Sequence, residues 1–106
     1  MNPTTAKTKT AIKKLIEATD ALAARIGDNR DLRIARGLME GAIRYIDQGD
    51  TDKAGRLLYD ARGLIARIAN HATGQTEAAR KYHRARLLGE GDPTRALTAW
   101  VMEASA

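Results

Sequence analysis

The sequence predicts an all-α protein, folded as a compact bundle or a short helical-hairpin array of about five helices. Apolar residues recur at the three- and four-residue spacing that places them on one face of a helix. Glycines and capping side chains separate the periodic segments, as they do at helix ends. No segment shows two-residue alternation, and no Asn-Gly or Asp-Gly pair indicates a β-hairpin. The 106 residues fit one domain and not two.

The first helix is expected from about Thr10 to Ile26. Gly27 follows it and can adopt the left-handed conformation that ends many helices. Asp28 or Asn29 then caps the second helix. The apolar face of the first helix consists of Ile12, Leu15, Ile16, Leu22, Ala23 and Ile26.

The second and third helices are expected on either side of a turn at Gly49, with Asp50 or Thr51 capping the third. The second helix runs to about Asp47, and the third ends near Gly74 with the cleanest amphipathic pattern in the chain. The apolar stripe of the second helix is Ala35, Leu38, Met39, Ala42, Tyr45 and Ile46. That of the third is Ala54, Leu57, Leu58, Ala61, Leu64, Ile65 and Ile68.

The fourth helix, about Thr76 to Leu88, is shorter and less regular, because Arg86 interrupts its apolar face. Two glycines end it, and Asp92-Pro93 then predicts a cap followed by proline in the first turn of a fifth helix. The apolar residues of these two helices are Ala78, Ala79, Tyr82 and Ala85, then Ala96, Leu97, Trp100 and Val101.

Residues 1–9 are expected to form a flexible basic arm ahead of a single helical domain at residues 10–106. The lysines of this arm and those at the start of the first helix form one basic group. Such a group can bind along a nucleic acid or simply remain solvated. The whole chain has 18 Lys and Arg against 13 Asp and Glu, a net charge of +5. Such a balance attracts anionic partners. The basic group is Lys7, Lys9, Lys13 and Lys14.

A signature of helix pairing spans residues 38–61. Leu38, Ala42 and Tyr45 precede a Gly-Asp turn, and Ala54, Leu58 and Ala61 follow it. This stretch resembles one tetratricopeptide-type helical hairpin, which implies protein–protein recognition through helix faces. The chain departs from the family pattern at Gly41, where leucine is usual, and at Ala66, where proline is usual. An echo of the turn at 91–96 follows after 42 residues, whereas such repeats have a period of about 34.

No pattern in the sequence specifies a reaction, a metal or a cofactor, so we expect a protein that is not an enzyme. The absence of cysteine excludes disulfides, thiolate zinc sites and cysteine nucleophiles. His71 and His83 fit no ligand spacing, no glycine-rich phosphate loop is present, and Ser105 is the only serine. No apolar run approaches the about 20 residues of a membrane span. We therefore expect a cytoplasmic protein without a membrane partner.

The outer face of the third helix is the first candidate binding surface. About 100° of rotation per residue places Tyr59, Arg56 and Gly63 opposite the buried face, with Arg67 close by. Tyr and Arg are enriched among the residues that dominate interface energies. The alternative is that the fourth or fifth helix packs over this face.

Three glycines inside the second and third helices add to this interpretation. Gly37, Gly41 and Gly63 each cost about 1 kcal/mol relative to alanine in a helix interior. Gly37 and Gly63 both follow Ala-Arg and lie nearly level when counted from the turn. All three are expected to lie off the core of the hairpin, so they indicate close approach by another helix, a second subunit or a partner, with sequence drift as the alternative.

A second candidate surface is the basic cluster Arg80, Lys81, Arg84 and Arg86 on the fourth helix. Such a cluster can contact phosphates and release their counterions. The alternative is that these long side chains solvate a short helix and cover apolar neighbours.

The leading hypothesis is a small adaptor, regulator or inhibitor that docks on a protein partner through the outer faces of the second and third helices. The residues expected to bind are Tyr59, Arg56, Arg67, Gly63 and Gly37. The alternative is a nucleic-acid-binding protein that uses residues 80–86. The sequence does not decide whether the protein forms a homodimer, because Trp100 suits a dimer interface as well as a core.

Overall fold

The computed structural model describes residues 3–106, which form five α-helices joined by short turns. They are α1 (Pro3–Ile26), α2 (Arg30–Asp47), α3 (Thr51–Thr73), α4 (Glu77–Leu88) and α5 (Pro93–Ser105). The described range contains no strand, so the all-α prediction is confirmed. The radius of gyration is 13.0 Å, which matches the about 13 Å expected of a compact domain of 100 residues.

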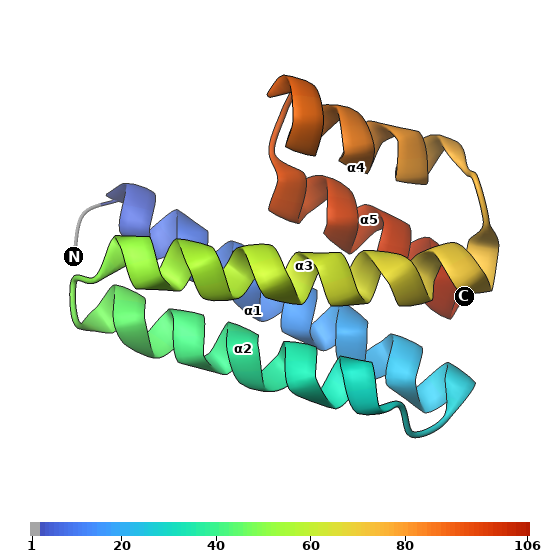
Figure 1. The fold of residues 1–106 in the computed structure, drawn as a ribbon, viewed down its shortest axis with the longest axis horizontal. Helices are drawn as coiled ribbons and strands as arrows, with labels where there is room; N and C mark the ends of the chain where they lie inside the picture. The colour runs from blue at the N-terminus through green and yellow to red at the C-terminus, as the bar shows by residue number, and fades with distance from the viewer. Residues whose placement is uncertain (1–2) are drawn as a thin grey trace.

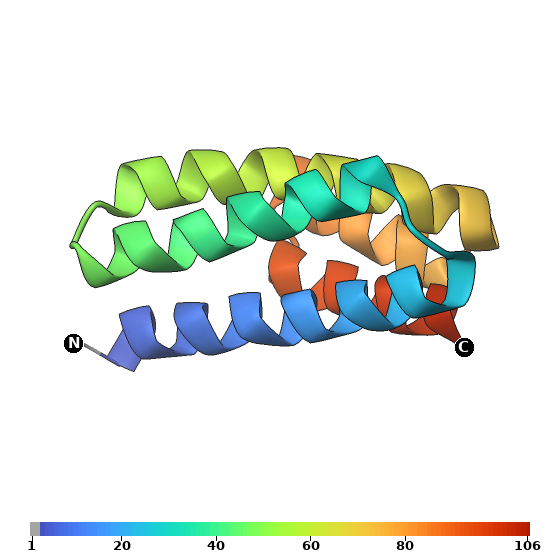
Figure 2. The same ribbon diagram turned by 90° about the horizontal axis from the view of Figure 1, so that it is seen from below.

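The five helices form a long layer and a short hairpin. α2 and α3 pack as an antiparallel pair and α1 runs alongside them, while α5 packs against α1 and α3 and α4 packs against α5 (Figure 1). Seen from below, α5 lies against α1 and leaves the N-terminal half of α1 free of the short hairpin (Figure 2). α5 therefore connects α4 to the rest of the core.

Side-chain caps fix where the helices begin. Asn29 and not Asp28 caps α2, because its side chain accepts a hydrogen bond from the Leu32 amide at 3.1 Å. Asp50 and not Thr51 caps α3 in the same way, at 3.1 Å from the Lys53 nitrogen. The glycines between helices, including the predicted breaks, have φ between 72° and 103°. L side chains rarely adopt this conformation, which explains why glycine marks these turns.

α1 begins at Pro3, so the predicted start at Thr10 is wrong. Residues 3–9 form the first two turns of this helix, and the predicted arm begins with Met1 and Asn2, which lie outside the described residues. Lys9 forms an ion pair with Asp47 at 2.7 Å, which joins the early part of α1 to the end of α2. The apolar pattern gave no sign of these turns, because their residues have little to bury.

The core is built from the predicted apolar stripes. Its largest fully buried members come from α1, α2, α3, α4 and α5 together: Ile12, Leu15, Leu22, Met39, Ile65, Tyr82, Leu97, Trp100 and Val101. Trp100 donates a hydrogen bond from its indole nitrogen to the Thr73 hydroxyl at 2.8 Å. Because its side chain is completely buried within one chain, Trp100 belongs to the core and is not available as a dimer contact.

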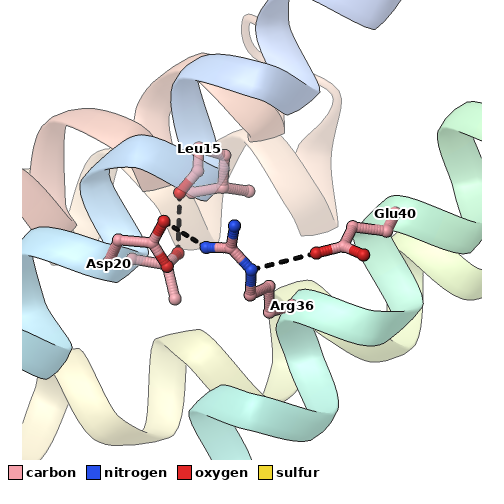
Figure 3. Close-up of polar contacts among 5 residues, drawn as sticks. Leu15, Asp20, Arg36 and Glu40 are labelled. Carbon is pink, nitrogen blue, oxygen red and sulfur yellow. Dashed lines mark hydrogen bonds and ion pairs between the residues drawn. The ribbon is translucent and has the colours of Figure 1, made fainter.

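Polar contacts at the surface link α1 to α2. Arg36 of α2 lies between Asp20 of α1 and Glu40 of its own helix, with Nε 2.9 Å from a Glu40 carboxylate oxygen (Figure 3). The Asp20 carboxylate raises the pKa of Arg36 by hydrogen bonding and charge. Exposed pairs of this kind contribute about 0–1 kcal/mol. This cluster therefore orients α1 and α2 and carries no sign of a binding role.

Candidate functional site

The predicted interface residues of α3 are at the surface. Tyr59 is 53% exposed, Arg56 and Arg67 are exposed, and Gly63 is partly covered. Gly37 on α2 is also exposed. The outer face of α3 is thus open to a partner at Tyr59, although one side chain from α4 reaches it.

That side chain is Arg86, which joins the two candidate surfaces. Its guanidinium donates a hydrogen bond from Nη2 to the Tyr59 hydroxyl at 2.7 Å. The guanidinium carbon also lies 4.7 Å from the centre of the Tyr59 ring, within range of a cation–π interaction. Sequence spacing could not predict this contact, because 27 residues separate the two positions.

Exposed apolar side chains follow Arg86 in the last turn of α4. Leu87 is 76% exposed and Leu88 is 69% exposed. We refer to Tyr59, Arg86, Leu87 and Leu88 as the α3–α4 patch. The sequence pattern does not identify either leucine, because both lie outside the apolar stripe of α4 and nothing local distinguishes a solvent-facing leucine from a buried one.

A hollow of about 540 Å³ lies beside Tyr59 on the outer face of α3. Gly55, which has no heavy atom within 4 Å of the position of an added Cβ, contributes to this hollow. The hollow is shallow and is lined by Thr51, Asp52, Gly55, Arg56, Tyr59 and Asp60. It leaves room for a side chain of a partner next to the tyrosine ring.

Arg62 and Tyr82 lie beneath the α3–α4 patch. Tyr82 is completely buried, and its hydroxyl makes no hydrogen bond of ordinary geometry within residues 3–106, although Arg86 lies close to it. The Arg62 Nε is likewise buried without a partner. Burial is the main cause of both pKa shifts: it lowers the pKa of Arg62 and raises that of Tyr82.

The four head groups of Tyr59, Arg62, Tyr82 and Arg86 act on one another. The charges of Arg86 and Arg62 partly oppose the effect of burial on the Tyr82 pKa. The Arg86 charge also lowers the pKa of Arg62, because the two cations are close. These side chains of α3 and α4 therefore form one polar cluster.

The basic cluster predicted on α4 is partly neutralised. Arg80 lies 3.0 Å and Arg84 3.8 Å from carboxylate oxygens of Glu77. These arginines lower the pKa of Glu77, mainly through the Arg80 hydrogen bond. Arg86 is engaged by Tyr59, so Lys81 is the one member of the cluster that forms no hydrogen bond or ion pair among residues 3–106, although its charge acts on Glu77.

The helix-interior glycines fall into two kinds. Cβ atoms added to Gly37 and Gly63 would have no heavy atom within 4 Å. At Gly41 an added Cβ would be 3.1 Å from Leu57 Cδ1, so this glycine serves the close approach of α2 and α3. Gly41 therefore lies inside the hairpin, contrary to the prediction that all three glycines lie off the core.

A groove of about 620 Å³ separates the exposed edges of α1 and α5. Three cations without ion pairs among residues 3–106, namely Lys7, Lys14 and Arg95, contribute to its walls, and Met102 to its apolar part. The sequence predicts that Lys7 and Lys14 belong to one basic group. It does not predict that they lie beside α5, since the packing of α1 against α5 depends on topology.

The two histidines have no site around them. His83 packs 5.8 Å from the Trp100 ring and 5.4 Å from the Tyr82 ring. Within residues 3–106 no group of His, Asp and Glu side chains is arranged to hold a metal ion. His83 thus has a packing role between α4 and α5.

Comparisons with protein-family models, curated proteins and solved structures found no match for this chain. No helix within the described range combines the length and the hydropathy that crossing a membrane requires. The chemistry of the α3–α4 patch and of the cluster beneath it is therefore the basis for a functional proposal.

Proposed function

We propose that this protein is a non-catalytic binding protein, a small adaptor, regulator or inhibitor that docks on a protein partner through the α3–α4 patch. One observation carries the proposal. Arg86 holds the exposed Tyr59 ring by a hydrogen bond and a cation–π contact, and two leucines that are at least 69% exposed follow it.

This combination suits a protein interface. Tyr and Arg supply much of the energy in protein complexes, particularly beside apolar contacts that exclude water. Because Tyr59 and Arg86 are already held in place, binding would cost less side-chain entropy than ordering two free side chains. A partner that covers the patch can extend along α3 over Arg56, Gly63 and Arg67, in keeping with the hairpin resemblance of residues 38–61.

Binding to nucleic acid is supported less well. Arg80 and Arg84 share Glu77, so their charges are partly neutralised before any phosphate approaches. Exposed leucines add nothing to contacts with a phosphate backbone, which depend on Lys and Arg. We expect a protein partner and keep the cytoplasmic location as part of this proposal.

The test compares wild-type protein with Tyr59→Ala and Arg67→Gln in capture of proteins from the source cells. We expect both variants to keep the helical circular dichroism of the wild type and to lose the same captured protein, Tyr59→Ala more completely. If both variants unfold, the face is part of the core and the proposal fails.

Labelled single- and double-stranded oligonucleotides provide the competing test, by fluorescence anisotropy at low and moderate salt. We expect no binding at moderate salt. Micromolar binding that decreases steeply with salt and is lost in a Lys81→Gln variant would instead favour nucleic acid.

A further inference from the structure

The two arginines of the α3–α4 polar cluster have no acidic partner. Within residues 3–106 neither Arg62 nor Arg86 forms an ion pair with a carboxylate. Burial lowers the pKa of Arg62, and the charge of Asp92 partly opposes this effect. The Asp92 carboxylate is engaged as the cap of α5, where it accepts from the Thr94 nitrogen at 2.9 Å and the Arg95 nitrogen at 3.5 Å. The cluster thus contains two cations and no carboxylate bound to them.

Hydroxyl groups surround these cations. Arg86 donates to the Tyr59 hydroxyl at 2.7 Å, and Arg62 Nη1 lies 3.5 Å from the Thr94 hydroxyl. The Tyr82 hydroxyl and the Arg62 Nε are buried and make no hydrogen bond of ordinary geometry. Burial raises the pKa of Tyr82, and the nearby Arg86 partly opposes this through its charge and through side-chain hydrogen bonding. Tyrosine and threonine hydroxyls can donate as well as accept. The hydrogen bonds of the two guanidinium groups therefore end on neutral hydroxyl oxygens and not on carboxylates.

Such an arrangement lacks a negatively charged group that could pair with the two guanidinium groups. Buried polar groups are nearly always hydrogen-bonded, and leaving one unpartnered is costly. Here one unpartnered donor belongs to a cation, and a second cation lies close enough to lower its pKa. An anion with several acceptor oxygens would satisfy both donors and remove the repulsion between the guanidinium groups.

We propose that Arg62, Arg86, Tyr59 and Tyr82 bind the phosphate monoester group of a phosphorylated ligand. A phosphate monoester carries a charge of about −1.5 to −2 at pH 7 and three strong acceptor oxygens. This matches two guanidinium groups and the adjacent hydroxyls better than the single charge of a carboxylate. Arg86 is exposed, so the group can enter from solvent by replacing the Tyr59 hydroxyl at Arg86.

The site goes beyond the docking proposal and can be tested without a protein partner. Binding of inorganic phosphate to the full chain would be measured by calorimetry at constant ionic strength. The variants are Tyr82→Phe, which removes one buried hydroxyl, and Arg86→Gln. The matched control is Arg44→Gln, which removes the same charge from an exposed position on α2 outside the cluster.

We expect Arg86→Gln to weaken phosphate binding about tenfold or more and Tyr82→Phe several-fold, since hydrogen bonds to charged groups are the stronger ones. Arg44→Gln should bind like the wild type. The NMR signal of the Arg62 Nε–H group should shift with phosphate in the wild type and much less in Arg86→Gln. This local signal separates the site from general attraction of anions to a basic protein.

Further titrations distinguish the source of the phosphate group. A phosphoserine peptide and a sugar phosphate compare a modified protein with a small metabolite, and acetate and dimethyl phosphate serve as singly charged comparators. Tighter binding of either monoester than of both comparators would support the site. Equal binding of all four anions, equal binding by all variants, or no phosphate binding at 10 mM, about the level of a very weak site, would overturn it. The docking proposal would be untouched by that result, because docking on a protein partner does not require Arg86 or Tyr59 to bind a phosphate ion.

Discussion

At the residue scale, two tyrosines on facing helices differ in what surrounds their hydroxyl groups. Tyr59 accepts a hydrogen bond from Arg86 at the surface, whereas the Tyr82 hydroxyl is buried without a partner. The sequence predicted that Tyr59 points outward and that Tyr82 lies on an apolar face, and both are confirmed. It could not predict the polar cluster between them, because that cluster joins residues from two helices distant in sequence.

Replacing each tyrosine with phenylalanine should therefore change stability in opposite directions. Tyr82→Phe removes an unpartnered buried hydroxyl and should raise the free energy of unfolding by up to about 1–2 kcal/mol. Tyr59→Phe removes a hydrogen bond and should lower it by about 0.5–1 kcal/mol. Urea unfolding followed by circular dichroism measures both. A loss of stability in Tyr82→Phe would mean that its hydroxyl is bonded in the folded protein.

The pH dependence of stability provides a second test of Tyr82. Burial raises the pKa of Tyr82 in the folded protein above its value in the unfolded chain, which is about 10. The unfolded chain therefore loses this proton first. The contribution to stability is complete below about pH 10 and decreases as the pH rises toward the folded-state pKa. Above pH 10 the wild type should lose stability more steeply than Tyr82→Phe, and parallel unfolding curves would contradict this.

At the element scale, the helices follow from patterns that are local in sequence. Caps such as Asn29 and Asp50 and the positive-φ glycines lie where spacing and turn chemistry place them. The start of α1 was missed because its first turns pack few apolar residues, so periodicity contains no signal there. The role of Gly41 was missed because the space beside it depends on which residue of α3 lies opposite, here Leu57.

The glycines of α2 and α3 should respond differently to alanine. Gly37→Ala and Gly63→Ala should each stabilise the protein by about 0.5–1 kcal/mol, since a Cβ there meets nothing and alanine favours helix. Gly41→Ala should gain less or lose stability, because its Cβ would press on Leu57 at 3.1 Å. Thermal unfolding compares the three. If Gly37 or Gly63 lies in the interface, the stabilised variant should also bind the partner less tightly.

At the scale of the whole molecule, the all-α class and its apolar stripes could be predicted from the sequence. Which residues of different helices lie together in the candidate sites could not. Two surfaces that were rival candidates from sequence, Tyr59 on α3 and Arg86 on α4, are in contact. Packing of α5 against α1 and α3, and of α4 against α5, creates this contact and also the groove beside α1. Such juxtapositions depend on helix order and crossing, which no local pattern contains.

The oligomeric state is a prediction at the same scale. Trp100, the largest apolar side chain, is buried within one chain and bonded to Thr73. We therefore expect Trp100→Ala to destabilise the fold by about 3–5 kcal/mol and not to change a monomer–dimer equilibrium selectively. Sedimentation and unfolding of this variant provide the check. A folded variant that has lost self-association would place Trp100 at an interface instead.

The measurement that tests the docking proposal most directly compares the exposed leucines of α4 with an exposed methionine elsewhere. Leu87→Ser/Leu88→Ser removes the apolar part of the α3–α4 patch, and Met102→Ser removes a similarly exposed apolar side chain, 60% exposed, from α5. Both proteins should fold like the wild type, because none of these side chains is in the core. We predict that the double leucine variant loses the captured partner protein, while Met102→Ser retains it. Retention by the leucine variant, or loss only with Met102→Ser, would contradict the proposal and move the binding surface to the α1–α5 groove.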